Sequence, residues 1–357
     1  MINLYSIRPK GFNVGNDVIY VALKGFLERA FGSEYLNIIS LPATNKYESS
    51  KKAGFTKGVI YEVNQFGHGV ILGGGNLYEN GEIDIDPIAL KALDKPFMIC
   101  SVSRGRIYNK QNQLVDRTDV IGDASLKMLN EKATYRLSRD EATRDYIEGL
   151  GVENEVGACP TLFLNEFIGE KNISKQYETD CLISIRTPNL MSVPPEKQYE
   201  LREILKQSIV DLKSRGYHNV KILCHDHRDI PFADSFSEVD YIFTDDASKF
   251  LDILRSTRLN ITFRLHSFLP CLSLGIPAIN IGYDERALSL TESIGMGDWN
   301  IHYINDDVNA ELRNRMDNLG ELEKIKDANR DTRWAEIREN FIKNFAAFAE
   351  DVKKVRD

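Results

Sequence analysis

The chain has 357 residues, 42% of them hydrophobic, and a formal net charge of −8 at pH 7. This length and hydrophobic content suit two domains of ordinary size. The acidic balance argues against a general surface for nucleic acid or for an anionic membrane, because either partner calls for a net basic face. An anionic ligand would therefore need a local basic pocket.

Five cysteines are scattered along the chain without close pairs, most of them in apolar runs. They are typical of reduced, buried residues in a cytoplasmic protein. The first residues lack the basic and apolar segments of a secretion signal, and no apolar run approaches the ~18 residues of a membrane span. We expect a cytoplasmic protein without a transmembrane segment, and leave open peripheral membrane association and an oligomer.

In the first half, short β-branched runs alternate with amphipathic segments, which favours a parallel sheet covered by helices. We expect residues 1–168 to form one doubly wound, Rossmann-like lobe. Its predicted strands are 1–7, 35–40, 69–75, 97–102, 133–139 and 155–160, and its predicted helices are 16–31, 124–129 and 141–150.

After a polar stretch the same alternation restarts, and we expect residues 178–325 to form a second Rossmann-like lobe. Its predicted strands are 181–186, 219–225, 239–245, 259–266 and 277–283, and its predicted helices are 195–215, 247–256 and 267–274.

The last segment, residues 326–357, has no strand pattern, and its apolar residues recur at helical spacing. These are Trp334, Ile337, Phe341, Phe345 and Phe348. We expect a closing helix that packs back on the first lobe. The predicted fold class is thus α/β, with two doubly wound lobes facing each other across a cleft in a glycosyltransferase-B-like architecture. Ligands of such folds bind outside the carboxyl ends of the strands.

The loop after the first strand holds Asn13, Gly15, Asn16 and Asp17. Glycines let backbone amides approach an anion or a sugar, and the N-terminus of the next helix adds its dipole. We therefore regard these four residues as candidates for substrate binding. A tight turn with an Asn or Asp helix cap explains the same letters equally well.

A second loop has three consecutive glycines, Gly73, Gly74 and Gly75, directly after an apolar strand and before Asn76. Each glycine costs about 0.5–1 kcal/mol relative to alanine, so something should gain from the bare backbone. We expect a ligand or the opposing loop to contact these four residues. The loop lacks the Gly-Lys-Ser/Thr of a Walker A motif and the spacing of a dinucleotide fingerprint.

Two arginines lie at predicted strand ends, Arg139 in the first lobe and Arg186 in the second. At the carboxyl edge of a sheet, each is placed to bind an anionic substrate. The alternative is that Arg139 pairs with a neighbouring carboxylate and that Arg186 is a solvated rim residue.

The stretch FRLHSFLPCLSLGIP, residues 263–277, puts an arginine and a histidine into apolar surroundings that tolerate them badly unless they are paired. If a strand over 259–266 runs out at the cleft, Arg264 and His266 point to the same side. The guanidinium suits a phosphate or carboxylate, and the imidazole can donate to the same anion or move a proton near neutral pH. A helix beginning near Ser267 would add its amides. The structural alternative is a histidine satisfied by a backbone carbonyl.

The sequence HDHRD at 225–229 offers potential metal ligands. Adjacent loop residues rarely converge on one ion, and no distant ligand cluster stands out, so we expect no metal site. The nucleophile motif GxSxG is absent.

The chain resembles the polysaccharide pyruvyl transferase family over nearly its whole length. The segments that carry the resemblance are NVGND, VILGGGNLYENG, LSRDEATRDYIEGLGV, ACPTLFL, LISIR and FRLHSFLPCLSLGIPAINIGYDERALSLTESIGM. The last is the most specific, with Arg-X-His, Gly-X-Pro, and Tyr283-Asp284 ahead of the basic Arg286. The resemblance implies two Rossmann-like lobes and transfer of pyruvate from phosphoenolpyruvate to two hydroxyls of a sugar as a ketal.

By this resemblance, Arg264 and His266 form the catalytic donor site in the second lobe, with His266 as acid or phosphate ligand. Arg139 or Arg186 would be a second anion clamp, and Tyr283 and Arg286 would contact substrate. The first lobe would bind the acceptor, a sugar or lipid-linked glycan of a cell-surface polysaccharide precursor. No cofactor is expected beyond phosphoenolpyruvate as co-substrate.

Two other functions fit the same scaffold. One is a glycosyltransferase with a nucleotide-sugar donor, although LISIR supplies no obvious pocket for the base. The other is a non-catalytic glycan-binding protein.

We expect Arg264→Ala and His266→Ala each to abolish turnover with little loss of folding.

Overall fold

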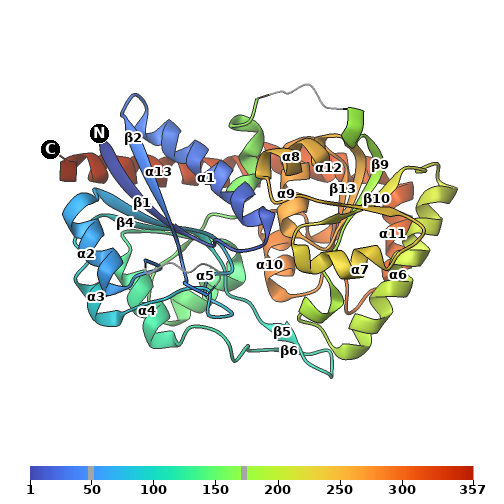
Figure 1. Ribbon diagram of the computed structural model, residues 1–357, viewed down its shortest axis with the longest axis horizontal. Helices are drawn as coiled ribbons and strands as arrows, with labels where there is room; N and C mark the ends of the chain where they lie inside the picture. Colours follow the sequence, from blue (N-terminus) through green and yellow to red (C-terminus); the bar gives the residue numbers. More distant parts are fainter. Residues whose placement is uncertain (47–51, 170–174, 357) are drawn as a thin grey trace.

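The computed structural model describes residues 1–46, 52–169 and 175–356, which form two α/β lobes lying side by side (Figure 1). Each lobe contains a six-stranded sheet in which neighbouring strands run parallel. The predicted α/β class with two doubly wound lobes is confirmed. Among the described residues, no helix is both long and apolar enough to cross a bilayer.

The N-terminal lobe orders its strands β2-β1-β3-β4-β7-β8. Helix α1 and the C-terminal helix cover one face of this sheet, and α2 to α5 cover the other. All six FMICSV side chains of β4 are buried, as expected for a strand covered on both faces. The bounds are β1 Ile2–Arg8, α1 Val14–Phe31, β2 Leu36–Pro42, α2 Lys57–Phe66, β3 Gly69–Gly75, α3 Pro87–Lys91, β4 Phe97–Val102, α4 Asp123–Lys132, β7 Tyr135–Ser138, α5 Glu141–Gly149 and β8 Glu155–Val156.

The C-terminal lobe orders its strands β11-β10-β9-β12-β13-β14. This is the order of a dinucleotide-binding Rossmann sheet, with the first strand of the lobe in its centre. The strands are β9 Thr179–Ser184, β10 Val220–Cys224, β11 Asp240–Phe243, β12 Thr257–Thr262, β13 Ala278–Gly282 and β14 Ile301–His302. The helices are α6 Pro195–Ser214, α7 Ile230–Asp234, α8 Ala247–Arg255, α9 Leu265–Ser273, α10 Glu285–Ser293, α11 Val308–Asp317 and α12 Leu319–Arg330.

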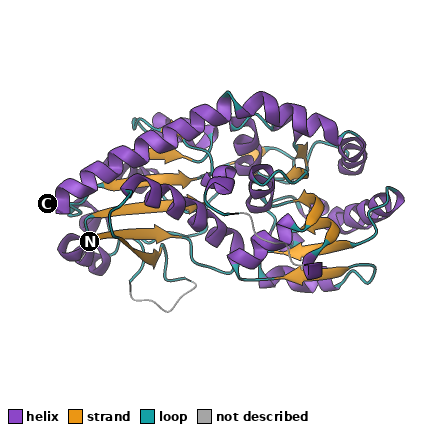
Figure 2. Ribbon diagram, turned by 90° about the horizontal axis from the view of Figure 1, so that it is seen from above, coloured by secondary structure: helices purple, strands orange, loops and turns teal. Residues whose placement is uncertain are grey.

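The last helix, α13 (Arg333–Arg356), returns to the N-terminal lobe as expected. Figure 2 shows it running from the C-terminal lobe across the N-terminal one. The ring of Phe341 stacks on Phe26 of α1, with 4.9 Å between the ring centroids. The helix begins at Arg333, whereas residues 319–330 form the separate helix α12.

Polar contacts tie the two lobes together beside the cleft. A short hairpin, β5 (Ile107–Tyr108) with β6 (Leu114–Val115), reaches from the N-terminal lobe toward the C-terminal one (Figure 1). The Tyr108 hydroxyl lies 2.8 Å from Nε2 of His302, and Nε of Arg106 donates to Glu285 over 2.8 Å. These contacts join the two lobes.

Candidate active site

A cavity of about 360 Å³ lies between the lobes. In a parallel sheet, a crevice forms at the carboxyl ends of the strands where the strand order reverses, because the two adjacent loops turn away from each other. The order reverses between β1 and β3 in the N-terminal lobe and between β9 and β12 in the C-terminal lobe. Loops after all four strands line the cavity, so its position follows from the strand order.

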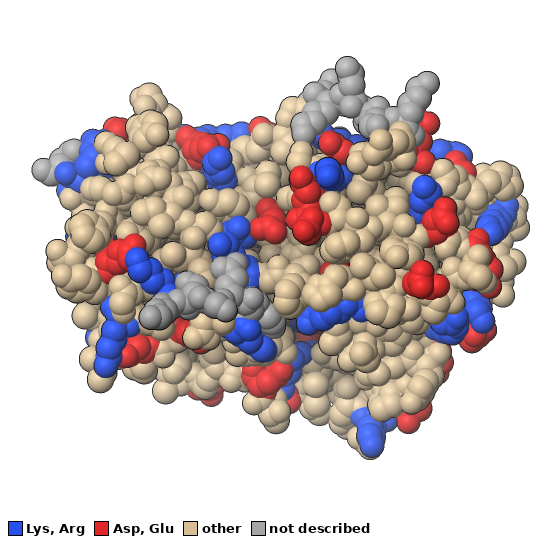
Figure 3. Space-filling model, viewed as in Figure 1, with Lys and Arg blue, Asp and Glu red and all other residues tan. Residues whose placement is uncertain are grey.

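The cavity lining is strongly cationic. Two acidic residues line it, Glu82 and Asp284, against seven basic ones, namely Lys46, Arg117, Arg139, Arg186, Arg228, Arg264 and Arg286. On the outer face in Figure 3, basic and acidic side chains are interspersed instead. The positive charge is thus local, as the acidic composition led us to expect.

Arg264 and His266 both line the cavity, but the strand alternation predicted for them is wrong. Strand β12 ends at Thr262, whose hydroxyl oxygen accepts the Arg264 N–H over 2.9 Å. Arg264 is the extended residue before α9, and His266 lies in the first turn of that helix. The two side chains therefore reach the cavity from a strand-to-helix turn rather than from one face of a strand.

The Arg264 guanidinium is anchored inside the C-terminal lobe although its side chain lines the cavity. It is only 8% exposed and forms an ion pair with the fully buried Asp229. Its Nε donates to the Ile185 carbonyl over 2.8 Å. Removing Arg264 would leave the Asp229 carboxylate buried and unpaired, so we now expect Arg264→Ala to lose stability as well as turnover.

His266 offers an unpartnered nitrogen to the cavity. Its Nε2 is buried without a hydrogen-bond partner, and its Nδ1 lies 2.3 Å from where a β-carbon on Gly15 would stand. Burial lowers the pKa of His266 well below its usual value, and the nearby charges of Arg139, Arg264 and Arg286 lower it further. The imidazole is therefore neutral at neutral pH.

Arg139 directly follows β7 and lines the same cavity from the N-terminal lobe. Its side chain is 4% exposed, and neither Nε nor Nη2 has a hydrogen-bond partner. The next residue, Asp140, accepts hydrogen bonds from Thr143 and Ser289 but none from Arg139. A buried guanidinium without hydrogen bonds is costly, and an anionic ligand would satisfy it.

Arg186 and Tyr283 line the cavity from the C-terminal lobe, as predicted. Nε of Arg186 donates to the Leu190 carbonyl over 3.3 Å, and its Nη1 lies 3.7 Å from the buried Asp226 carboxylate. Burial and the Arg264 charge lower the pKa of Arg186 to about 10, which keeps it protonated at neutral pH. Burial raises the pKa of Tyr283, so its hydroxyl stays neutral.

Arg286 lines the cavity and also joins the lobes. Its Nη1 lies 2.9 Å from Oε2 of Glu79, a fully buried residue of the N-terminal lobe, and it pairs with Asp284 in its own lobe. The Gly105 N–H donates to the other Glu79 oxygen over 2.7 Å. No local pattern in the sequence indicates Glu79 as a partner of Arg286, because the two residues lie about 200 residues apart along the chain.

The triple glycine lies outside the cavity lining. The absence of side chains there mainly lets strand β3 approach helix α1 closely. A β-carbon on Gly73 would stand 2.5 Å from Leu23, and one on Gly74 would stand 2.5 Å from Ile19. Gly74 and Gly75 also have positive φ angles of 78° and 81°, which favour glycine. These glycines let β3 pack tightly under α1, whereas Asn76 does line the cavity.

In the loop after β1, too, some of the predicted residues line the cavity and others do not. Asn13 and Asn16 line the cavity, and the Asn13 side chain also caps α1 by accepting the Gly15 N–H over 2.9 Å. Asp17 lies outside the cavity lining and forms an ion pair with Arg8 at 2.7 Å. Gly15 supports the ring of His266 rather than lining the cavity.

Ser267 also lies outside the cavity lining. Its side chain is fully buried, and its hydroxyl oxygen lies 2.9 Å from that of Ser184 and accepts from Asn260 over 2.8 Å. These contacts hold α9 on strands β9 and β12. The contribution predicted for Ser267 was through the amides of the helix start, and its own N–H donates to the Arg264 carbonyl over 2.9 Å.

The HDHRD loop is held by ion pairs. Asp226 and Asp229 are fully buried and pair with Arg228 and Arg264 respectively. His225 is also fully buried, and neither of its ring nitrogens has a hydrogen-bond partner. Within the described part of the chain, no group of three His, Cys, Asp or Glu residues could hold a metal ion.

Sequence reasoning missed several residues that line the cavity. They are Phe12, Lys46, Asn80, Glu82, Arg117, Ser192 and Arg228. Arg228 could have been found, because it follows the predicted strand 219–225 and so belongs to the carboxyl edge of the sheet. Nη1 of Arg117 donates to Ser192 of the other lobe over 3.2 Å, a contact with no local sequence signal.

Known proteins are similar to this chain in sequence family and in fold. A family model described as polysaccharide pyruvyl transferase matches residues 13–285. No curated protein matches the chain. Among solved structures, the UDP-GlcNAc 2-epimerase of Methanocaldococcus jannaschii, in complex with UDP-GlcNAc and UDP, is 11% identical with a TM-score of 0.55, over 88% of this chain and 92% of its own.

Two other solved structures are comparably similar. The S. aureus MnaA–UDP structure is 13% identical, with a TM-score of 0.53 over 91% of this chain and 90% of its own. The UDP-GlcNAc 2-epimerase of Neisseria meningitidis, bound to UDP-GlcNAc, is 10% identical, with a TM-score of 0.52 over 90% of this chain and 99% of its own. At these identities the similarity shows the two-lobed, glycosyltransferase-B-like fold alone.

Proposed function

Because the chain belongs to the polysaccharide pyruvyl transferase family, we propose that it transfers the pyruvyl group of phosphoenolpyruvate to two hydroxyls of a sugar, as a ketal. The sugar would be part of a cell-surface polysaccharide precursor, either as a free sugar or as a lipid-linked glycan. The reaction would take place in the cytoplasm. Family membership supports an enzyme of polysaccharide biosynthesis. We assign the donor to the C-terminal lobe and the acceptor to the N-terminal lobe.

One observation carries the choice of donor. The buried guanidinium of Arg139 and the buried Nε2 of His266 lack hydrogen-bond partners, and both line the same cavity from opposite lobes. Buried polar groups without partners are uncommon in native proteins, and where they line a cavity a ligand would supply the partner. The surrounding excess of arginines favours an anion as this ligand.

Phosphoenolpyruvate matches this requirement, since it carries a phosphate and a carboxylate on one small carbon frame. Arg139 would bind one anionic group in a bidentate manner, and Arg186 and Arg264 lie on the opposite wall for the other. Neutral His266 can donate from Nε2 to the phosphate. A bound anion would offset the arginine charges that lower the His266 pKa, so the imidazole would gain a proton as the donor binds and could then act as an acid.

Calorimetry with phosphoenolpyruvate tests this proposal. We expect binding to the wild-type protein, at least 100-fold weaker binding to Arg139→Gln, and unchanged binding to Arg144→Gln. Arg144 is a matched control because it lies on α5 close to Arg139 but pairs with Asp145 and lies outside the cavity lining.

Other titrants separate the alternatives. Wild-type protein that binds UDP-N-acetylglucosamine but not phosphoenolpyruvate would overturn the proposal in favour of a nucleotide-sugar donor. The third outcome is binding of glycans with neither phosphate release from phosphoenolpyruvate nor turnover of any other donor. It would favour a glycan-binding protein.

A further inference from the structure

One helix of the C-terminal lobe, α10, is bonded to the N-terminal lobe along one of its faces. Arg286, Ser289 and Ser293 follow each other at intervals of three and four residues, so they share a face of this helix. The Ser289 hydroxyl donates to the Asp140 carboxylate over 3.2 Å, and the Ser293 hydroxyl oxygen accepts the Glu141 N–H over 3.0 Å. Arg286 completes this face with its ion pair to the N-terminal lobe.

Glu79 is the partner of Arg286 in the N-terminal lobe. Its carboxylate is fully buried, and one oxygen accepts from Nη1 of Arg286 over 2.9 Å while the other accepts the Gly105 N–H over 2.7 Å. Arg117, which lines the cavity from the same lobe, lies 3.8 Å from this carboxylate. A β-carbon on Gly105 would stand 2.5 Å from the Arg286 side chain, so the glycine lets the two lobes meet closely at this point.

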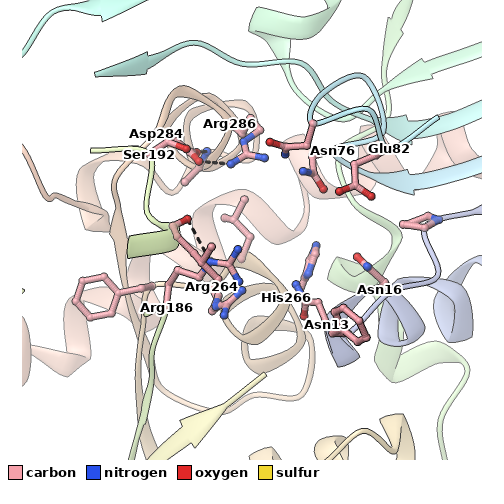
Figure 4. Close-up of a pocket in the computed structure, with 18 of the residues that line it drawn as sticks. Asn13, Asn16, Asn76, Glu82, Arg186, Ser192, Arg264, His266, Asp284 and Arg286 are labelled. Carbon is pink, nitrogen blue, oxygen red and sulfur yellow. Dashed lines mark hydrogen bonds and ion pairs between the residues drawn. The ribbon is translucent and has the colours of Figure 1, made fainter. Parts of the chain in front are cut away.

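The charge of Arg286 is used in these contacts. Besides Glu79, it pairs with Asp284 of its own lobe. Two carboxylates contact one guanidinium, so its positive charge is already balanced within the protein. Figure 4 shows Arg286 beside Asp284 and directed toward Asn76 of the N-terminal lobe, on another side of the cavity from Arg186 and Arg264. Arg286 is therefore better placed to join the lobes than to bind an anionic donor.

The donor proposed above needs cations from both lobes at once. Arg139 belongs to the N-terminal lobe, whereas Arg186 and Arg264 belong to the C-terminal lobe. One small molecule contacts both walls only if they stand at the right distance, and a misplacement of about 1 Å costs up to about 10²-fold. Arg139 directly precedes Asp140, on which Ser289 of α10 is docked. The docking of α10 thus bears on the position of Arg139 relative to the opposite wall.

We infer that Glu79 is a positioning residue for the donor: by holding Arg286 it seats α10 on the N-terminal lobe and sets the distance between Arg139 and the arginines of the opposite wall. This inference rests on the proposed function. Glu79 lies outside the cavity lining, so it acts through Arg286 and not by contact with a substrate. Arg286 in turn joins the lobes, in place of the contact with substrate that the family resemblance implies.

The test is a double-mutant cycle of Glu79→Gln and Arg286→Gln, with phosphoenolpyruvate affinity measured by calorimetry. We expect each single variant and the double variant to bind about 10- to 100-fold more weakly than wild type. The three losses should agree within about threefold, because both substitutions break the same link.

Inorganic phosphate is the second titrant, because it is small enough to bind to one wall alone. Glu79→Gln should change its affinity by less than about threefold, since the distance between the walls does not enter. A general loss of structure would weaken both titrants alike. Ser289→Ala is a milder change on the same face of α10, and it should weaken phosphoenolpyruvate binding by about 3- to 10-fold, the effect of one hydrogen bond.

Glu166→Gln is the matched control. The Glu166 carboxylate pairs with Arg29 and Arg338, and the residue lies outside the lining of the cavity between the lobes. Its substitution also removes an ion-paired carboxylate, but it leaves the contacts of α10 with the N-terminal lobe in place. Phosphoenolpyruvate should bind this variant as tightly as wild type.

Three results overturn the inference and leave the proposed function standing. The first is wild-type phosphoenolpyruvate affinity in Glu79→Gln, or in Ser289→Ala if Glu79→Gln does not fold. The second is a much larger loss in Arg286→Gln than in Glu79→Gln, because Arg286 would then contact the donor itself. The third is equal weakening of phosphoenolpyruvate and phosphate. Wild-type protein that does not bind phosphoenolpyruvate overturns both the inference and the proposed function.

Discussion

Replacing Arg139 by methionine should stabilise the empty protein and weaken its binding of phosphoenolpyruvate. A structural arginine would give the opposite result for stability. The Arg139 side chain is 4% exposed, and its Nε and Nη2 have no hydrogen-bond partner. The adjacent Asp140 compensates only in part, since burial raises the pKa of Asp140 to about 6 despite the nearby arginine charge.

The magnitudes follow from these contacts. Replacing a poorly compensated buried charge by an apolar side chain of similar volume typically stabilises by about 1–3 kcal/mol. Two charge-assisted hydrogen bonds to the ligand contribute about 3–4 kcal/mol together, which corresponds to about 10²- to 10³-fold in affinity. Arg264→Met is the informative contrast, because it leaves the buried Asp229 carboxylate unpaired and should destabilise by about 3–5 kcal/mol.

Chemical unfolding of the two variants without ligand, together with calorimetry, measures both effects. Arg139→Met should unfold at higher denaturant concentration than wild type, and Arg264→Met at lower concentration. If Arg139→Met lowered stability as much as Arg264→Met and bound phosphoenolpyruvate normally, Arg139 would be a structural residue and the reasoning from its missing partners would be refuted.

Three further predictions concern the surroundings of His266. Gly15→Ala places a β-carbon within 2.6 Å of three His266 atoms, so we expect calorimetry to show at least tenfold weaker phosphoenolpyruvate binding. The control is Gly58→Ala, whose β-carbon meets open space and which should bind normally. Near pH 6, phosphoenolpyruvate binding should take up a proton at His266, seen as a binding enthalpy that depends on the buffer, and His266→Gln should abolish this uptake. Burial lowers the pKa of His225 well below 6.5. Below pH 6.5 the unfolded chain therefore binds a proton at His225 that the folded protein does not bind. The free energy of unfolding should then fall on acidification by about 1.4 kcal/mol per pH unit. His225→Phe should remove that contribution to the slope, and an unchanged slope in urea unfolding between pH 5 and 6.5 would contradict the assignment.

The sequence predicted much of the architecture because long, regular elements leave a periodic pattern. The alternation of apolar strands and amphipathic helices indicated both lobes, and the spacing of Phe341, Phe345 and Phe348 indicated a closing helix. The helices α2 and α10, with ten and nine residues, were missed. Shorter elements were missed as well, among them α3 and α7 with five residues each and the hairpin of β5 and β6. A pattern of two to five residues is too short to show a period.

The candidate site was predicted in part. Arg139, Arg186, Arg264 and His266 line the cavity because the carboxyl ends of parallel strands meet at one edge of a sheet, a rule that needs only the strand positions. The boundary between β12 and α9 was misplaced, since the short apolar run is compatible with a strand or a helix until its packing is known.

By itself, the sequence determined which residue types stand at which strand ends, and hence that a cationic edge exists. Tertiary structure alone decided how those residues are used: that Asp17 neutralises Arg8, that Arg286 reaches Glu79 across the cleft, and that Glu82 faces the cavity. The physical reason is that the direction of a side chain follows from its own element, whereas its partner depends on the strand order and on the docking of the lobes. Both of these bring together residues that are far apart in the chain.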